Sequence, residues 1–587
     1  MSFGTCSDAA AAPPPAVPEV ARCELGAMAR ELERGVASLR LPDAPAPYLA
    51  IGRIMRWKSL ALDGSYGGII TDIEEVQAVG TVEVRVGAPA RDNANMFGQD
   101  GAQIRFLLAL EPAPAFTRKK LWLATDQAFR AAASTYAQKQ AILARLAGDP
   151  PPPDLGPAPP REAPPAATDV RDASFDRAGL RDMVEGLSAR FKEHPAIDNG
   201  DVYAQLLVAE GSMASSEGTR LRDRSARAVL AVTAQARAAD GMLLDHGRAL
   251  HFQELPTATA ELRAAGEQLV DAVLGELEAI AAAPMLDEDY DGPLLFTGDA
   301  AAQLLASTVA TEAAGTPAPL ADGGRMLELE PHWQDSLGKS VMPEFLDLRD
   351  DPSAEGFGRY ELDAEGFRAK PITLVERGEL RDLLMTRAPN EHLSQSNGRA
   401  RMSPVLQIAP AISNLTLRSR QPGKSEKALE RELLRRARED GYEFAYVITT
   451  LRDGTILGPV PREGAISFAS GRKVSLAPPL LIYRIDASGK RTLVRGAVFS
   501  PVSLRVLRRI RAVGATTHAV PLRILAGSQG GFGGETGMDG ILSHTVDVQV
   551  NAPDLLIDGF ELLVERGEHE RLPTLVHPLR DEGWSAR

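Results

Sequence analysis

Cysteine is almost missing from this sequence of 587 residues, in which Cys6 and Cys23 are the only two and both lie near the N-terminus. Two cysteines cannot build a disulfide framework or a cysteine-rich zinc site, so packing of the core must supply the stability.

Long apolar runs are also missing, since no stretch approaches the roughly 20 apolar residues of a membrane-spanning helix. Residues 1–17 lack the basic and apolar regions of a signal peptide. We therefore expect no membrane partner and a cytoplasmic location, although a start codon placed downstream of a true signal would give the same picture.

Positive charge is the second shortage. Lys and Arg number 65 against 79 Asp and Glu, which gives a formal net charge of -14. Nucleic-acid surfaces gain affinity from clustered Lys and Arg that displace counterions, so we expect no nucleic-acid partner. One basic cluster, formed by Arg505, Arg508, Arg509 and Arg511, has the spacing of a solvated helix face.

Histidine is scarce as well, and the nine histidines form no His-x-x-x-His or His-x-His pair. His246 and His251 are five apart in a predicted strand, which places them on opposite faces and favours structural roles. His569 lies among glutamates in a predicted surface turn, which is typical of a solvated polar cluster.

The acidic run at residues 287–292 resembles the start of a calcium loop, but Gly298 holds the position of the bidentate ligand, so we interpret the run as an acidic turn. The glycine-rich residues 527–540 lack the Lys-Ser/Thr of a phosphate loop, and we interpret them as a mobile loop.

The patterns that are present predict an α+β protein of two domains. Residues 1–20 are rich in Ala and Pro and predict a disordered tail. Residues 21–283 alternate short β-type runs with long helical patterns, and we expect an N-terminal α/β domain with helices on a sheet. Residues 286–587 are rich in strand signals with frequent Gly and Pro, and we expect a C-terminal β-rich, barrel-like domain.

A proline-rich stretch interrupts the first domain at residues 148–167. Consecutive prolines favour extended polyproline geometry and exclude both helix interiors and central strands. The predicted strands that follow, at residues 202–208, 227–233 and 242–252, are needed to complete the sheet begun before the stretch. We therefore expect an exposed excursion that proteases cut readily.

Several local patterns together resemble the TldD/PmbA (TldE) family along almost the whole chain. They are residues 63–68, 84–87 with 92–93, 216–220, 292–296, 342–346, 363–378 and 383–387. The strongest is the block 363–378, which predicts a hairpin with apolar strands on either side of a Glu-Arg-Gly turn. A generic hairpin does not explain the Met-Pro-Glu-Phe-Leu segment at 342–346, which stands where the family has it. The resemblance implies a metallopeptidase-type scaffold.

The resemblance also implies where a metal would be bound. Active family members carry His-Glu-x-x-x-His on the helix that follows the strand at 292–296, with a cysteine from the C-terminal domain as a further ligand. One alignment puts Ala306, Ser307 and Thr311 at these helix positions, and a second puts Thr311, Glu312 and Thr316 there. Both imidazoles are missing in either register, and no cysteine follows Cys23. Zinc needs nitrogen, sulfur or carboxylate donors, so we expect no bound zinc, no other cofactor and no catalytic residues of the family type.

By resemblance, the chain belongs with the metal-less branch, whose members pair with a metal-bearing subunit of the same fold around unfolded peptides. We expect a homodimer, or a heterodimer with a metal-bearing TldD-type paralogue, that acts in proteolysis or peptide maturation. Two alternatives stay open: an active metallopeptidase with an unrecognised ligand set, and a stand-alone scaffold or binding protein. The family's name as a modulator of DNA gyrase implies no DNA contact that an acidic chain would support.

Overall fold

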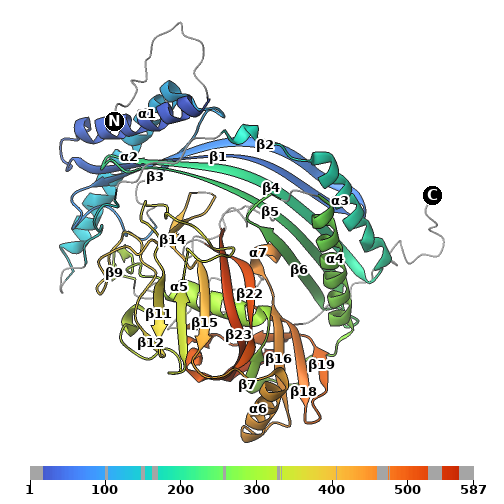
Figure 1. Ribbon diagram of the computed structural model, residues 1–587. Helices are drawn as coiled ribbons and strands as arrows, with labels where there is room; N and C mark the ends of the chain where they lie inside the picture. The colour runs from blue at the N-terminus through green and yellow to red at the C-terminus, as the bar shows by residue number, and fades with distance from the viewer. Residues whose placement is uncertain are drawn as a thin grey trace.

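The computed structural model describes residues 17–98, 103–146, 152–160, 169–255, 259–326, 331, 333–404, 406–458, 473–474, 476–525 and 545–567. Within these residues the α+β class is confirmed, because helices cover one face of an arched sheet that stands over a second, strand-rich part (Figure 1). No helix of the described part is long and apolar enough to cross a membrane.

The arched sheet has six antiparallel strands in the order β3-β2-β1-β4-β5-β6. Their bounds are β1 (Pro47–Ser65), β2 (Gly68–Val86), β3 (Gln103–Leu107), β4 (Ile197–Ser215), β5 (Arg220–Arg237) and β6 (Leu243–Phe252). The strands β1 and β4 lie on opposite sides of the proline-rich stretch and pair with each other, as we expected. The strands predicted at residues 202–208, 227–233 and 242–252 correspond to β4, β5 and β6, and β4 and β5 are longer than we expected.

Four helices cover the convex face of the arch, α1 (Val17–Ser38) and α2 (Pro114–Leu143) at one end and α3 (Arg177–Ala189) and α4 (Thr259–Ala282) at the other (Figure 1). Side chains of a strand alternate between the two faces. In β5, Leu230 packs in the core with α4, while Val229 packs on the concave face against Ile456. The first helix begins at Val17, inside the tail that we expected to extend to residue 20.

The second sheet has 11 strands, nine of them in the order β12-β11-β10-β15-β23-β7-β16-β18-β19, and β20 and β22 also pair with β23. Their bounds are β7 (Tyr290–Phe296), β10 (Leu346–Asp350), β11 (Ile372–Glu376), β12 (Glu379–Leu380), β15 (Asn414–Ser419), β16 (Phe444–Leu451), β18 (Pro479–Asp486), β19 (Arg491–Val494), β20 (Ala497–Phe499), β22 (Ile510–Leu525) and β23 (Thr545–Val564). The barrel-like expectation is wrong. A barrel closes only when its first and last strands pair, and the end strands β12 and β19 have no pairing with each other.

Helices pack on both faces of this sheet. Alternating residues of β7 separate the two cores: Leu294 and Phe296 pack with α5 (Asp299–Glu312), and Leu295 packs with α6 (Glu426–Glu439). The sheet draws on residues 290–564 and the arched sheet on residues 47–252. The predicted domain boundary at 283–286 lies between them and remains a prediction.

Short elements complete the described part. They are β8 (Leu320–Ala321), β9 (Gly324–Arg325), β13 (Ala400–Met402), β14 (Ile408–Pro410), β17 (Lys473–Val474), β21 (Val502–Ser503), α7 (Gly454–Leu457) and the 3₁₀ turns η1 (Val170–Asp172), η2 (Arg190–Glu193), η4 (Gln334–Ser336) and η5 (Leu504–Arg509). The helix expected around the basic cluster is only the 3₁₀ turn η5. The chain then enters β22, where Arg511 binds Asp558 at 2.5 Å.

Candidate functional site

The helix α5 occupies the place where the family resemblance puts a metal site, directly after β7. It packs against the sheet through small and branched side chains, and Ala306 is buried with only 5% of its surface exposed. Ser307 is exposed, but its hydroxyl donates to the carbonyl of Gln303 at 2.8 Å. The neighbouring Thr308 hydroxyl donates to the carbonyl of Leu304 at 2.7 Å. Both hydroxyl protons are used within the helix. Of the first register, the described side chains therefore offer only the methyl group of Ala306 and the internally bonded hydroxyl of Ser307.

The second register places Glu312 and Thr316 at the end of α5. Glu312 is 7% exposed, and its carbonyl accepts a hydrogen bond from the backbone of Trp333 at 3.2 Å. The Thr316 carbonyl accepts from Gln334 Nε2 at 2.5 Å. The side chain of Thr311 lies outside the described residues. Glu312 is therefore the one carboxylate that this register can supply.

These residues do not fit a zinc ion. A catalytic zinc takes three protein ligands, usually imidazoles with a carboxylate or thiolate, and the two registers together provide one carboxylate. Within the described residues, no group of three or more His, Cys, Asp or Glu side chains is placed to hold a metal. We derive no catalytic step through zinc for this chain.

His246 and His251, for which we expected structural roles, each contact a side chain within the fold. His246 Nε2 lies 2.7 Å from Glu276 of α4, on the convex face of the arch. His251 lies on the concave face, where its ring packs against Phe357 with centroids 5.3 Å apart. The expectation that they occupy opposite faces is confirmed. His569 and the glycine-rich residues 527–540 lie outside the described residues.

Patterns that are far apart in the sequence meet between the concave face of the arch and the second part of the chain. Arg387, at the end of the 383–387 pattern, binds Glu217 of the 216–220 pattern through two parallel hydrogen bonds of 2.7 and 2.8 Å. The Arg387 backbone N–H also donates to Glu365 Oε2 at 2.6 Å. Arg387 therefore anchors the second part of the chain to the arch, and its side chain is only 6% exposed.

The proline-rich stretch contributes to the same junction. Gly156 and Pro157 accept hydrogen bonds from Arg387 Nε at 3.1 and 3.0 Å. Asp154 accepts from the backbone of Asp92 at 2.8 Å and from Lys139 Nζ at 2.8 Å. Leu155 is buried in an apolar cluster on the concave face. Within residues 152–160, Leu155 and Pro159 are buried, whereas Pro153, Pro157, Ala158 and Pro160 are exposed. The segment is therefore held at the junction with part of its surface open to solvent.

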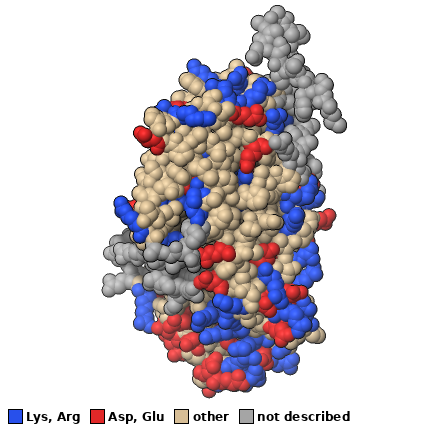
Figure 2. Space-filling model, turned by 90° about the vertical axis from the view of Figure 1, so that its left-hand side faces the viewer, with Lys and Arg blue, Asp and Glu red and all other residues tan. Residues whose placement is uncertain are grey.

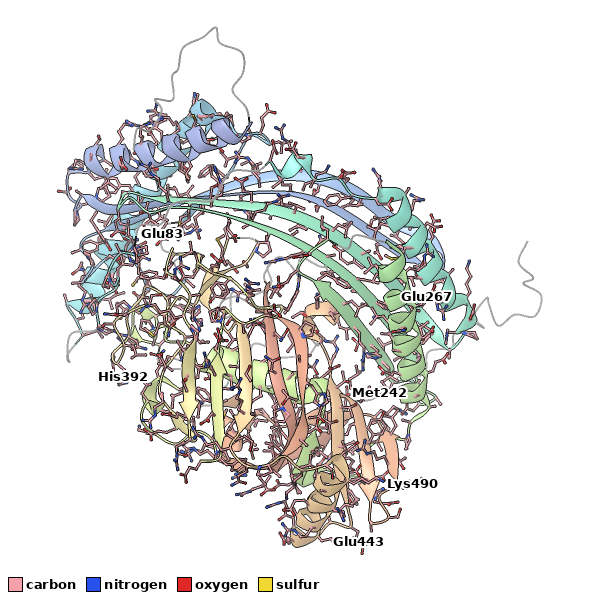
Figure 3. The ribbon with its side chains drawn as sticks, viewed as in Figure 1. Glu83, Met242, Glu267, His392, Glu443 and Lys490 are labelled. Carbon is pink, nitrogen blue, oxygen red and sulfur yellow. The ribbon has the colours of Figure 1, made fainter. Side chains whose placement is uncertain are left out.

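A buried charged group continues this junction along the arch. Glu83 of β2, labelled in Figure 3, binds Arg85 at 2.6 Å and Arg53 at 3.5 Å. Burial would raise the pKa of Glu83, but the two guanidinium groups outweigh it and lower the pKa. Arg85 also binds Asp92 at 3.0 Å, and Asp92 accepts a hydrogen bond from Tyr48 at 2.7 Å. Sequence reasoning missed this group, because its members are ordinary strand residues until the fold brings them together.

The comparisons with known proteins agree with this architecture. Residues 291–562 match the family model described as the PmbA/TldA metallopeptidase C-terminal domain. A protein named metalloprotease from Methanothermobacter thermautotrophicus is 39% identical over 83 residues, which cover 14% of this chain and 18% of that relative. The chain thus matches less than a fifth of the length of this curated relative.

Three solved structures share the fold over most of the chain. The structure of TldE from Thermococcus kodakarensis has a TM-score of 0.56 at 13% identity and covers 92% of this chain and 100% of its own. Two proteins described as modulators of DNA gyrase follow. The protein from Thermotoga maritima has a TM-score of 0.54 at 14% identity, and the match covers 88% of this chain and 96% of that protein. The protein from Bacteroides thetaiotaomicron has a TM-score of 0.55 at 11% identity, and the match covers 93% of this chain and 98% of that protein. At these identities the likeness shows the fold alone.

Proposed function

The chain belongs to the TldD/PmbA family, and from this we propose that it is a non-catalytic, peptide-binding partner subunit in proteolysis or peptide maturation. The observation that carries the proposal is the composition of α5. Where an active member would present imidazoles, this helix presents the buried methyl group of Ala306 and a Ser307 hydroxyl that is bonded to its own backbone. A hydroxyl is a poor substitute for an imidazole, since it would have to lose a proton at a very high pKa to become an anionic ligand.

Exposed apolar side chains support the partner role. Leu107 on the edge strand β3 is 73% exposed, and Phe116 and Leu123, two turns apart on one face of α2, are 43% and 50% exposed. Figure 2 shows a face whose middle has few charged side chains, between an upper edge with several charged residues and a lower part where both signs of charge are mixed. Soluble proteins rarely leave several large apolar side chains exposed together without a contact to make. A second chain of the same fold could extend the sheet at the open edge of β3, because that edge has unpaired backbone groups.

The proposal is tested by combining the purified protein with a paralogue that carries His-Glu-x-x-x-His. We expect the pair to cleave unfolded peptides, whereas this chain alone binds them without cleavage. Leu123→Glu should weaken the pairing measured by light scattering, because a carboxylate would be desolvated in an apolar contact. Glu439→Gln, on the exposed end of α6, is the control. Cleavage by this chain alone would overturn the proposal.

A further inference from the structure

Three arginines and one aspartate meet on the concave side of the arch, at its contact with the second sheet. Arg227 Nε of β5 lies 2.8 Å from Asp547 Oδ2 of β23, and Arg523 Nε of β22 lies 3.2 Å from Asp547 Oδ1. Arg401 Nη2 of β13 donates to the Asp547 carbonyl at 2.9 Å. We call Arg227, Arg401, Arg523 and Asp547 the arginine cluster. Its members come from both parts of the chain.

The arginine cluster has more positive than negative charge at contact range. The guanidinium groups of Arg227 and Arg523 contact the one carboxylate, and that of Arg401 is bonded to the backbone carbonyl of the same aspartate. The side chains of Arg523 and Asp547 are only 5% and 6% exposed. Among the described residues, no other carboxylate lies within 4 Å of these guanidinium groups. The nearby Asp350 is bound to Arg399 at 2.7 Å. Burying unbalanced charge is costly, so proteins keep such groups mainly where an anion compensates them.

The cluster also has hydrogen-bonding capacity that the described residues do not use. Arg523 Nε and Asp547 Oδ1 are close, but they are not aligned for a hydrogen bond, and both are buried without a partner. The Nδ1 atom of His251, which packs beside the cluster, is buried without a partner as well. Buried unpaired polar atoms of this kind commonly mark a site for an ion, water or ligand. The side chain of Arg227 is 25% exposed, so the cluster can be reached from solvent.

We propose that the arginine cluster binds a carboxylate group of a peptide, either its C-terminus or an acidic side chain. Guanidinium groups match the planar shape of a carboxylate and form two parallel hydrogen bonds with it. The inference rests on the proposed peptide-binding function and names the chemical group that this function would recognise.

The first experiment measures the anion alone. The unfolding temperature of the full chain is compared in sodium acetate and in sodium chloride at equal ionic strength. We expect acetate to raise it above the value in chloride for the wild type and for Arg224→Gln, which changes an exposed arginine on the opposite face of β5. The difference should vanish in Arg523→Gln and in the more exposed Arg227→Gln. Equal temperatures in acetate and chloride for the wild type would overturn the carboxylate site.

The second experiment measures peptide affinity by calorimetry and separates the two carboxylate sources. The probes are one unfolded peptide in four forms, with a free or amidated C-terminus and with Glu or Gln in its sequence. The form whose carboxylate is recognised should bind roughly tenfold more tightly or better, and Arg523→Gln and Arg227→Gln should remove that advantage. If no peptide binds while acetate still stabilises, the carboxylate site stands and the peptide-binding function fails. If peptides bind equally well in all forms and variants, the site is contradicted and the function stands.

Discussion

At the scale of single residues, the most informative side chains are those that join the two parts of the chain. The residues of α5 that stand at the family's metal-ligand positions could be named from the sequence, because the resemblance allows only two alignments of this helix. The anchor formed by Arg387 and Glu217 could not be read in this way. Each residue belongs to a recognised pattern, but 170 positions separate them, and only the fold shows that they bind each other.

The first prediction concerns this anchor. Arg387→Ala should lower the free energy of unfolding by about 3 kcal/mol, because it removes the two bonds to the Glu217 carboxylate and the bonds to the carbonyls of Gly156 and Pro157. The measurement is denaturant unfolding of the full chain. Arg435→Ala is the matched control, since Arg435 is an exposed arginine paired with Glu432 on α6, and it should change little. Equal effects of the two substitutions would contradict the anchoring role.

A second prediction concerns pH and His251. Burial, and then the charge of Arg523, lower the pKa of His251 to about 3 from its ordinary 6.5. The unfolded chain therefore takes up this proton at a higher pH than the folded chain does. The contribution of the neutral His251 ring to the free energy of unfolding is present in full above about pH 6.5. It is lost as the pH falls toward 3, and about 2 kcal/mol of it is lost at pH 5.

The comparison of wild type with His251→Phe at pH 7 and pH 5 tests this assignment. The substitution retains a ring against Phe357 and removes the titrating group. We expect the variant to lose less free energy of unfolding between the two pH values than the wild type loses. Identical losses would show that His251 takes up its proton as readily in the folded chain as in the unfolded chain.

At the scale of elements, the hairpin β11–β12 shows why a local pattern was predictable. Its Glu-Arg-Gly turn has positive φ angles of 49° at Arg377 and 77° at Gly378, which is the turn type that pairs two strands closely. The 342–346 segment contacts the same turn, because Val341 and Met342 donate to the Gly378 carbonyl at 2.8 and 3.1 Å. This contact explains why the two patterns occur together.

The third prediction follows from this turn. A methyl group at Gly378 would lie 2.4 Å from the Met342 carbonyl oxygen, in addition to the strain of its positive φ. Gly378→Ala should therefore destabilise the chain by more than about 1 kcal/mol. Gly489→Ala is the control, because Gly489 has a similar φ of 84° but no atom within 4 Å of the added methyl group. If thermal unfolding shows the same change for both, the contact with the 342–346 segment contributes nothing.

The proline-rich stretch shows the limit of prediction from composition. The described residues 152–160 contain no helix or strand, as the prolines indicate, but composition does not reveal which of them are bound. Asp154 and the carbonyls of Gly156 and Pro157 have hydrogen-bond partners, while Pro153, Ala158 and Pro160 are exposed.

The fourth prediction is that the Leu155–Gly156 bond resists proteolysis in the folded chain. Asp154→Ala should increase cleavage there, because it removes the bonds to Lys139 and to the Asp92 backbone. Mass spectrometry of fragments from limited proteolysis identifies the cut. Rapid cleavage after Leu155 in the wild type would mean that this segment is not held.

At the scale of the whole molecule, periodicity and turn signals predicted the α+β class, and the family resemblance predicted a helix after the strand at 292–296, where α5 lies. They could not predict the open second sheet, whose strands pair across long sequence distances, such as β15 with β23 and β7 with β16. They also could not predict the arginine cluster, because a lone arginine in a strand has no sequence signature of a shared site. The arch and the second sheet are joined by contacts, such as those of Arg387 with Glu217 and of Arg227 with Asp547, that only the fold brings together.

The central claim is that this chain is the partner without a metal. The most direct measurement is elemental analysis of the purified protein, joined with a peptidase assay with and without a chelator. The account predicts no stoichiometric zinc and no cleavage by the isolated chain, because Ala306, Ser307 and Glu312 cannot supply three ligands. Stoichiometric zinc, or peptidase activity that a chelator abolishes, would contradict the account and require a metal site made by other residues.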